Sequence, residues 1–303
     1  MNRALQLARN GEGRVSPNPM VGAVITHGTR IIGEGFHAFY GGPHAEVNAI
    51  NSVRKEDLPL LKESTIYVTL EPCAHHGKTP PCANLIVEKG IPRVIIGSLD
   101  PNPLVAGKGV KILRDAGVDV SCGVLEKECV DINRRFMKAH SLSLPWITLK
   151  WAQSADGFLA TNDDSGKPVP VKFSSDLSSV WMHRERGSQD AILVGANTER
   201  IDHPKLNVRL WGADSPQKFV AEGDFDCLEF VKRLRQDGVT SLMVEGGTKI
   251  LNSFITNDLY DEIRVETSPE ILHRGLKAPL IPQNVKLEKT EFCRNNIIQT
   301  YRR

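Results

Sequence analysis

The chain has 303 residues, of which 40% are hydrophobic and 24% are charged, as expected of a globular protein with sizeable cores. Its 38 basic and 36 acidic residues give a net charge of +2, which argues against a nucleic-acid or membrane partner. The N-terminus lacks the apolar run of a signal peptide, and no stretch approaches the roughly 20 apolar residues that span a bilayer. We therefore expect a cytoplasmic protein whose six cysteines are reduced thiols.

The first half of the chain alternates predicted strands and helices. Residues 1–10 have the apolar spacing of a short amphipathic helix. Val21–Ile25 and Ile31–His37 predict the two strands of a hairpin, and turn residues lie between them. Ser64–Leu70 and Val94–Gly97 are further strands, rich in β-branched residues, and a predicted helix follows each. This alternation predicts a layered α/β sandwich.

A second domain begins near residue 145. Residues 125–140 read as one long charged helix, which Ser141–Pro145 interrupts. We therefore expect domains at 1–144 and 145–303, because the length suits two domains of about 150 residues. The buried-strand patterns of Ala191–Gly195 and Leu242–Gly247 predict that the second domain is also α/β.

One histidine, two cysteines and a glutamate in the first half indicate a metal site. His44, Cys73 and Cys82 can supply the three protein ligands of a catalytic zinc, whose fourth position is left to water. Glu46 stands two residues after His44, at the start of a predicted helix, where it can act on that water without being a ligand. This pattern is typical of zinc-dependent deaminases, in which activated water attacks an amino-bearing ring carbon.

Two simpler interpretations compete with catalytic zinc. The thiols could merely pack, but Cys73 and Cys82 both follow proline in polar loop sequence. The metal could be structural, but only three ligands group naturally, and a carboxylate stands beside the histidine. The sequence therefore favours the catalytic interpretation.

The flanking segments resemble a known family. SPNPMVGAVI, GEGFH, PHAEVNAI, TLEPCAHHGKTPPCANLI and DPNPLVAGKG are similar to the deaminase domain of the bifunctional RibD family of riboflavin biosynthesis. The resemblance covers about residues 1–140 and implies a cytidine-deaminase-like three-layer α/β/α fold. It implies a diamino-oxo-pyrimidine substrate carrying a phosphoribosylamine, and the corresponding uracil as product. By the same resemblance the substrate-binding residues are Asn18, His37, His76, Lys78, Asp100 and Asn102.

The second half resembles the reductase domain of the same family. The similar segments are LKWAQSADGFLA, DAILVGANTERIDHPKLNVR, LMVEGGTKILNSF and PEILHRGLKAP. The resemblance implies a dihydrofolate-reductase-like α/β fold that uses NADPH. The implied cofactor-binding residues are Gln153, Thr198, Asp202, Gly247 and Thr248, and the implied substrate-binding residues are Leu206, Arg209 and Glu245. Asp156 is expected to shape a turn.

The chain departs from the family pattern at two places. Pro170-Val171-Lys172 stands where the family usually has Ser-x-Trp, and the segment between Arg209 and Glu245 is several dozen residues shorter. Residues 217–220 are interpreted as what remains of a lost strand. Two functions therefore stay open for the second domain: an NADPH reductase, or a catalytically inactive domain that serves oligomerisation, since the family commonly forms homo-oligomers.

A third interpretation, a nucleic-acid deaminase or RNA-binding module, is disfavoured. The charge is balanced and no basic stripe is present. Eight residues separate Cys73 from Cys82, whereas RNA and free-nucleoside deaminases usually have Cys-x-x-Cys.

Overall fold

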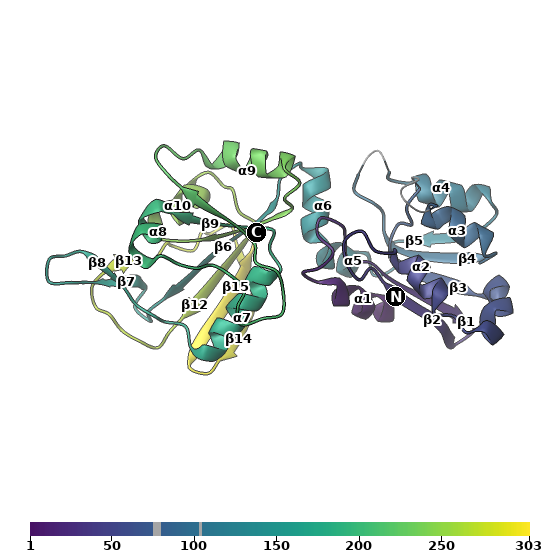
Figure 1. The fold of residues 1–303 in the computed structure, drawn as a ribbon, viewed down its shortest axis with the longest axis horizontal. Coiled ribbons are helices and arrows are strands. Elements are labelled where there is room, and N and C mark those ends of the chain that lie inside the picture. Colours follow the sequence, from purple (N-terminus) through teal and green to yellow (C-terminus); the bar gives the residue numbers. More distant parts are fainter. Residues whose placement is uncertain (75–79, 103–104) are drawn as a thin grey trace. The chain divides into compact units, whose positions relative to one another are not determined.

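The computed structural model describes residues 1–74, 80–102 and 105–303 (Figure 1). The chain forms two compact units, Met1–Ser143 and Leu144–Arg303, each with its own hydrophobic core. Within the described residues no helix combines the length and apolar character needed to cross a membrane.

The N-terminal unit is built on a five-stranded sheet with the order β2-β1-β3-β4-β5. Its strands are β1 (Gly22–His27), β2 (Arg30–Phe36), β3 (Thr65–Leu70), β4 (Arg93–Ser98) and β5 (Asp119–Cys122). β1 is antiparallel to β2 and β3, whereas β3, β4 and β5 are mutually parallel. Parallel neighbours need crossover connections, and helices supply them here.

Helices cover both faces of this sheet. They are α1 (Asn2–Ala8), α2 (Ala45–Asn51), α3 (Cys82–Glu88), α4 (Lys108–Asp115), α5 (Glu126–Ile132) and α6 (Arg134–Ser141), with 3-10 turns at Arg9–Gly11 and Lys55–Glu63. Gly35 allows α2 to approach β2, because a Cβ there would lie 2.3 Å from the backbone nitrogen of Ala49. Gly22 faces the opposite side, where a Cβ would lie 2.0 Å from the carbonyl oxygen of Ala4 in α1. The expected three-layer α/β/α architecture is confirmed.

The single long helix predicted over residues 125–140 is wrong. The structure has two helices, α5 and α6, which meet at Asn133. The Asn133 amide donates to the Met20 carbonyl at 2.9 Å and accepts from the Met20 N–H at 2.8 Å. These two bonds to a distant segment compete with continued helix, as short polar side chains do.

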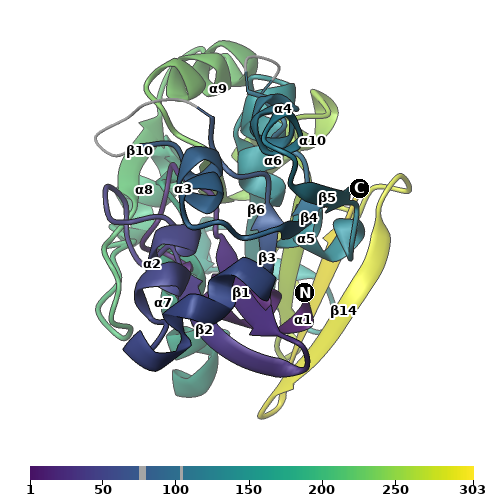
Figure 2. The same ribbon diagram turned by 90° about the vertical axis from the view of Figure 1, so that its right-hand side faces the viewer.

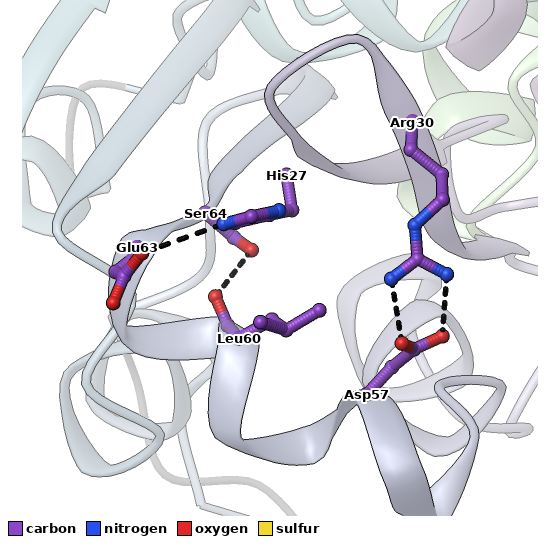
Figure 3. Close-up of polar contacts among 6 residues, drawn as sticks. All are labelled: His27, Arg30, Asp57, Leu60, Glu63 and Ser64. Carbon is purple, nitrogen blue, oxygen red and sulfur yellow. Dashed lines mark hydrogen bonds and ion pairs between the residues drawn. The ribbon is translucent and has the colours of Figure 1, made fainter.

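A 3-10 stretch, Lys55–Glu63, packs against the end of the β1–β2 hairpin. Arg30 makes two parallel hydrogen bonds of 3.0 and 2.6 Å to the Asp57 carboxylate (Figure 3). His27 lies 3.4 Å from Glu63 on the same stretch. These contacts attach the connection between α2 and β3 to the hairpin.

The C-terminal unit contains a seven-stranded sheet with the order β10-β9-β11-β6-β12-β15-β14. The strands are β6 (Trp146–Gln153), β9 (Ala191–Gly195), β10 (Gln217–Ala221), β11 (Ser241–Glu245), β12 (Glu262–Thr267), β14 (Lys286–Cys293) and β15 (Asn296–Arg302). The first five strands in spatial order are mutually parallel. β15 is antiparallel to β12, and β14 is antiparallel to β15. Figure 2 shows the yellow β14–β15 hairpin at one edge. Residues 217–220 therefore belong to an edge strand, β10.

A second, small sheet has the order β13-β7-β8. Its strands are β7 (Phe158–Asn162), β8 (Pro168–Pro170) and β13 (Leu276–Lys277). The polar residues 161–170 include the end of β7 and all of β8.

Four helices cover the large sheet: α7 (Asp176–Gly187), α8 (Ala196–Asp202), α9 (Cys227–Gln236) and α10 (Thr248–Thr256). Alternate residues of β9 face two different cores, as the period of a strand requires. Leu193 packs with residues of α9 and α10, whereas Ile192 packs with Met182 of α7. The side of the sheet facing α7 is the one that carries the charged groups described below.

Candidate active sites

Three elements bring the expected zinc ligands together. His44 is the N-cap of α2, Cys73 follows β3 in a loop, and Cys82 is the first residue of α3. Their ligand atoms all lie within 4.8 Å of one another. His44 Nδ1 lies 3.6 Å from the sulfur of Cys73 and 3.4 Å from that of Cys82.

This donor set fits zinc. Tetrahedral zinc with Zn–S bonds of about 2.3 Å and a Zn–N bond of about 2.05 Å places sulfur and nitrogen about 3.5 Å apart. The two observed separations of 3.6 and 3.4 Å lie on either side of that value. Hydrogen bonding by the Cys82 thiol, by His44 and by the Cys82 N–H lowers the pKa of Cys73, which favours the thiolate that metals bind.

Glu46 lies in the first turn of α2, two residues after His44, and is 3% exposed. Burial, and then the charge of Cys73, raise the pKa of Glu46 to about 7. A divalent cation on the three ligands acts in the opposite direction on a nearby carboxylate. The geometry suits a group that accepts a proton and later returns it.

Asn18 and His37 form a hydrogen-bonded pair beside the metal-ligand cluster. His37 Nδ1 donates to the Pro43 carbonyl at 3.0 Å, so its Nε2 accepts from the Asn18 amide at 3.1 Å. The His37 and His44 rings meet edge to face, with centroids 5.6 Å apart. Burial lowers the pKa of His37, although the hydrogen bond to the Pro43 carbonyl acts in the opposite direction.

Of the remaining expected substrate-binding residues, the structure describes Asp100 and Asn102. Asp100 follows β4, and its carboxylate accepts the Asn102 N–H at 2.8 Å. The backbone N–H of Asp100 donates to the Glu71 carboxylate at 3.3 Å. His76 and Lys78 lie outside the described residues.

The C-terminal unit contains a cavity of about 730 Å³ at the carboxyl ends of β9 and β11. This edge of a parallel sheet is where open α/β folds bind ligands. The expected site residues that line it are Thr198, Asp202, Leu206, Glu245, Gly247 and Thr248. Two others are not among its lining residues. Gln153 accepts the Trp151 indole N–H at 2.8 Å, and the exposed Arg209 donates to Asn207 at 2.9 Å.

A glycine turn joins β11 to α10 beside this cavity. A Cβ on Gly246 would lie 2.7 Å from a methyl of Ile250, so the turn needs a residue without a side chain. The Gly247 N–H donates to the Thr198 hydroxyl at 3.1 Å, which links the starts of α8 and α10. The N-terminus of α10 is thus at the cavity wall, where helix termini favour anions such as a pyrophosphate. The cavity's volume and this turn fit a dinucleotide.

The structure adds two charged residues that the sequence analysis missed. Register places Lys150 of β6 between Glu245 of β11 and Arg264 of β12. Arg186 of α7 makes two hydrogen bonds of 2.8 Å to Glu245. Lys150 could have been noticed, because it is one cation within the apolar run WITLKWA. Arg186 carries no comparable signal.

The ammonium of Lys150 has no carboxylate bound to it among the described residues, unlike the guanidinium groups of Arg186 and Arg264. Burial lowers the pKa of Lys150, although Glu245 and Glu266 act against that shift at longer range. Among the described residues Lys150 makes no hydrogen bond or ion pair, whereas Arg264 lies 3.5 Å from Glu185. Lys150 and Arg186 both line the cavity.

Asp156 shapes a turn, as expected from its Ala-Asp-Gly context. Its carboxylate accepts the N–H groups of Leu272 and His273 at 3.1 and 2.7 Å, and the Ser154 hydroxyl at 2.6 Å. The Ser154 hydrogen bond and these N–H groups lower the pKa of Asp156 to about 2. It therefore serves the backbone and does not supply protons.

Family models cover both units. The cytidine and deoxycytidylate deaminase zinc-binding region matches residues 1–98, and the RibD C-terminal domain matches residues 145–225 and 217–298. Fold, site and models together define a zinc-dependent deaminase joined to a reductase domain.

The whole-chain comparisons give the family. The chain is 37% identical to the riboflavin biosynthesis protein RibD of Bacillus amyloliquefaciens over 92% of its own length and 86% of the relative's. It is 36% identical to RibD of Aquifex aeolicus over 91% of its own length and 88% of that relative's. The chain belongs to the RibD family.

Solved structures agree with this. A diaminohydroxyphosphoribosylaminopyrimidine deaminase/5-amino-6-(5-phosphoribosylamino)uracil reductase from Thermotoga maritima is 35% identical, with a TM-score of 0.88 over 100% of this chain and 97% of that one. Acinetobacter baumannii RibD is 28% identical, with a TM-score of 0.88 over 99% of this chain and 97% of that one.

Proposed function

We propose that this chain catalyses two successive steps of riboflavin biosynthesis. It deaminates diaminohydroxyphosphoribosylaminopyrimidine to 5-amino-6-(5-phosphoribosylamino)uracil, and then reduces the ribosyl group of that product to ribityl with NADPH. The observation that carries the proposal is the grouping of His44, Cys73 and Cys82 around buried Glu46, in a chain that matches a structure bearing both activities along its full length.

In the deaminase site, His44, Cys73 and Cys82 would hold zinc, which when bound activates a water molecule for attack on the amino-bearing ring carbon. Glu46 takes a proton from that water and delivers it to the amino group. A C–O bond forms, the C–N bond breaks, and nitrogen leaves as ammonia. Proton transfer of this kind contributes about 10²–10⁴ in rate.

Two sets of residues would hold the pyrimidine substrate. The Asn18 amide, oriented by its hydrogen bond to His37 beside the metal ligands, would contact the edge of the ring. His76, Lys78, Asp100 and Asn102 are assigned to the ribose hydroxyls and the phosphate, for which their donors and acceptors are suited.

In the reductase site, the residues at and around the glycine turn would hold the cofactor. The assigned residues on that side are Gln153, Thr198, Asp202, Gly247 and Thr248, and those on the substrate side are Leu206, Arg209 and Glu245. NADPH when bound supplies the hydride that reduces the opened carbonyl or imine form of the sugar. Lys150 stabilises the negative charge that develops there, because its ammonium has no carboxylate partner of its own.

The shortened segment leaves the sheet continuous. β10 pairs with β9 in parallel over residues 217–221, so β9 is not left as an open edge. The two matches to the RibD C-terminal domain share residues 217–225, which contain β10. We infer that β10 takes the place of a longer family segment, and that the crevice between β9 and β11 is retained.

A second function is favoured by different observations. Arg209 is exposed and does not line the cavity, and residues 170–172 lack the family's Ser-x-Trp. A chain with these features could be a deaminase only, whose C-terminal unit serves oligomerisation. In either case we propose a cytoplasmic homo-oligomer that acts on a small molecule and binds no nucleic acid.

Ammonia release from the diaminopyrimidine substrate tests the first activity. The purified chain should bind about one zinc ion, lose turnover on chelation and regain it when zinc is restored. Turnover that survives complete zinc removal would exclude the proposed deaminase mechanism.

A further inference from the structure

Glu71 holds together two loops of the N-terminal unit. It follows β3 directly, stands two residues before Cys73, and is 5% exposed. Its carboxylate accepts four backbone N–H groups from the segment that follows β4. One oxygen accepts from Asp100 at 3.3 Å and Gly107 at 3.0 Å, and the other accepts from Gly109 at 2.9 Å and Val110 at 3.3 Å.

Close packing reinforces these bonds. Gly109 lies against the Glu71-Pro72 turn so tightly that a Cβ on it would be 2.0 Å from the Pro72 carbonyl oxygen. The Glu71 N–H also donates to the Ser98 carbonyl at 2.9 Å. The turn that leads to the zinc ligand Cys73 and the start of α4 therefore form one rigid junction.

Glu71 cannot share the role of Glu46. Both of its oxygens are occupied by backbone donors, and among the described residues no lysine, arginine or histidine pairs with it. Its charge is stabilised instead by N–H groups at the start of α4, where the helix dipole favours an anion. Such a carboxylate orders backbone and has no free lone pair directed at a substrate.

We infer that Glu71 is a positioning residue for deamination, and this inference rests on the proposed deaminase function. It fixes the loop carrying Asp100 and Asn102 at a set distance from Cys73. The groups assigned to the sugar phosphate are thereby held in register with the groups that act on the ring. Glu71 should therefore affect binding of the sugar phosphate. It should not affect metal binding or the proton transfer by Glu46.

Glu71→Gln tests this directly. The amide keeps one acceptor oxygen and turns an NH₂ group toward two backbone N–H groups, so half of the junction loses its bonds. We expect KM for the diaminopyrimidine substrate to rise about tenfold or more, with kcat within about threefold of wild type and zinc content unchanged. Glu88→Gln, at an exposed glutamate of α3, is the matched control and should change none of these.

A second readout is independent of catalysis. Amide hydrogen exchange at Gly107, Gly109 and Val110 should be slow in wild type and faster in Glu71→Gln. If Glu71→Gln fails to fold, Glu71→Asp can be used, because it keeps the charge and both oxygens on a shorter side chain. KM should then rise as well, but by a smaller factor. An unchanged KM, or loss of zinc or of kcat at unchanged KM, would overturn the inference. An inactive wild type would instead refute the deaminase function itself.

Discussion

Arg186 of α7 and Glu245 at the end of β11 form an ion pair with two hydrogen bonds of 2.8 Å at the wall of the C-terminal cavity. Both side chains are largely buried, with exposures of 13% and 11%. Burial alone raises the pKa of Glu245, but the Arg186 hydrogen bonds and charge lower it overall. Glu245 therefore stays ionised, and Lys150 remains the cation available to a ligand.

Glu245→Gln should impair the reductase and destabilise the C-terminal unit. The change leaves Arg186 buried without its partner, and breaking such a pair costs about 3–5 kcal/mol. Denaturant unfolding and NADPH oxidation measure the two effects, while ammonia release should be unchanged. Glu288→Gln, at an exposed residue of β14, is the control. Normal NADPH oxidation by Glu245→Gln would remove this residue from the site.

Lys150→Met should separate activity from stability. Removing a buried cation that lacks a partner should leave the free energy of unfolding unchanged or raised. NADPH oxidation with the uracil substrate should fall by about 10²-fold or more, because Arg186, another cation at the cavity, is already paired with Glu245. Turnover within about threefold of wild type would show that Lys150 has no catalytic role.

The structure groups the three zinc ligands predicted from the sequence, whereas Gln153 and Arg209 do not line the cavity of the C-terminal unit. His44, Glu46 and Cys82 lie at the starts of two helices, so local pattern was enough to place them. Arg186 and Glu245 are 59 positions apart and meet only through the packing of α7 on the sheet. No local pattern encodes such a contact.

Long-range hydrogen bonds explain the other differences. Asn133 ends α5 by bonding to Met20, which is 113 positions away, so helical periodicity alone could not place the break. The same holds for Glu71, which reads as part of a turn in the sequence but organises a loop about 30 to 40 positions later in the fold. Arg209 was assigned by family pattern, and in the structure it is exposed.

Glu46→Ala and Cys82→Ala should fail in different ways. Glu46→Ala should keep zinc and fold while ammonia release falls by about 10²-fold or more, because the proton carrier is lost. Cys82→Ala should lose the metal, since two ligands hold zinc poorly. Metal analysis beside the ammonia assay distinguishes them. Full zinc and activity in Cys82→Ala would contradict the ligand assignment.

His183 should make the C-terminal unit less stable in mild acid. Its Nδ1 accepts the Arg209 N–H at 2.9 Å, and burial, then Arg186 and Arg209, lower the pKa of His183. In the unfolded chain His183 therefore binds a proton near the ordinary histidine pKa of about 6.5. In the folded chain it binds a proton only at lower pH. Stability is fully present above that pH and is lost as pH falls toward the depressed folded value.

His183→Gln tests this dependence, because glutamine keeps an acceptor for the Arg209 N–H but does not titrate. Denaturant unfolding of the C-terminal unit at several pH values between neutrality and mild acid should show a smaller loss of stability in the variant. Equal pH dependence in both proteins would rule out His183 as its source.

The most direct test of the account records ammonia release and NADPH oxidation together in wild type and Glu46→Ala. Given the diaminopyrimidine, wild type should release ammonia and then oxidise NADPH, whereas Glu46→Ala should do neither. Given 5-amino-6-(5-phosphoribosylamino)uracil, both proteins should oxidise NADPH at the same rate. Failure of wild type to oxidise NADPH with the uracil compound would contradict the account and leave a deaminase with an inactive C-terminal unit.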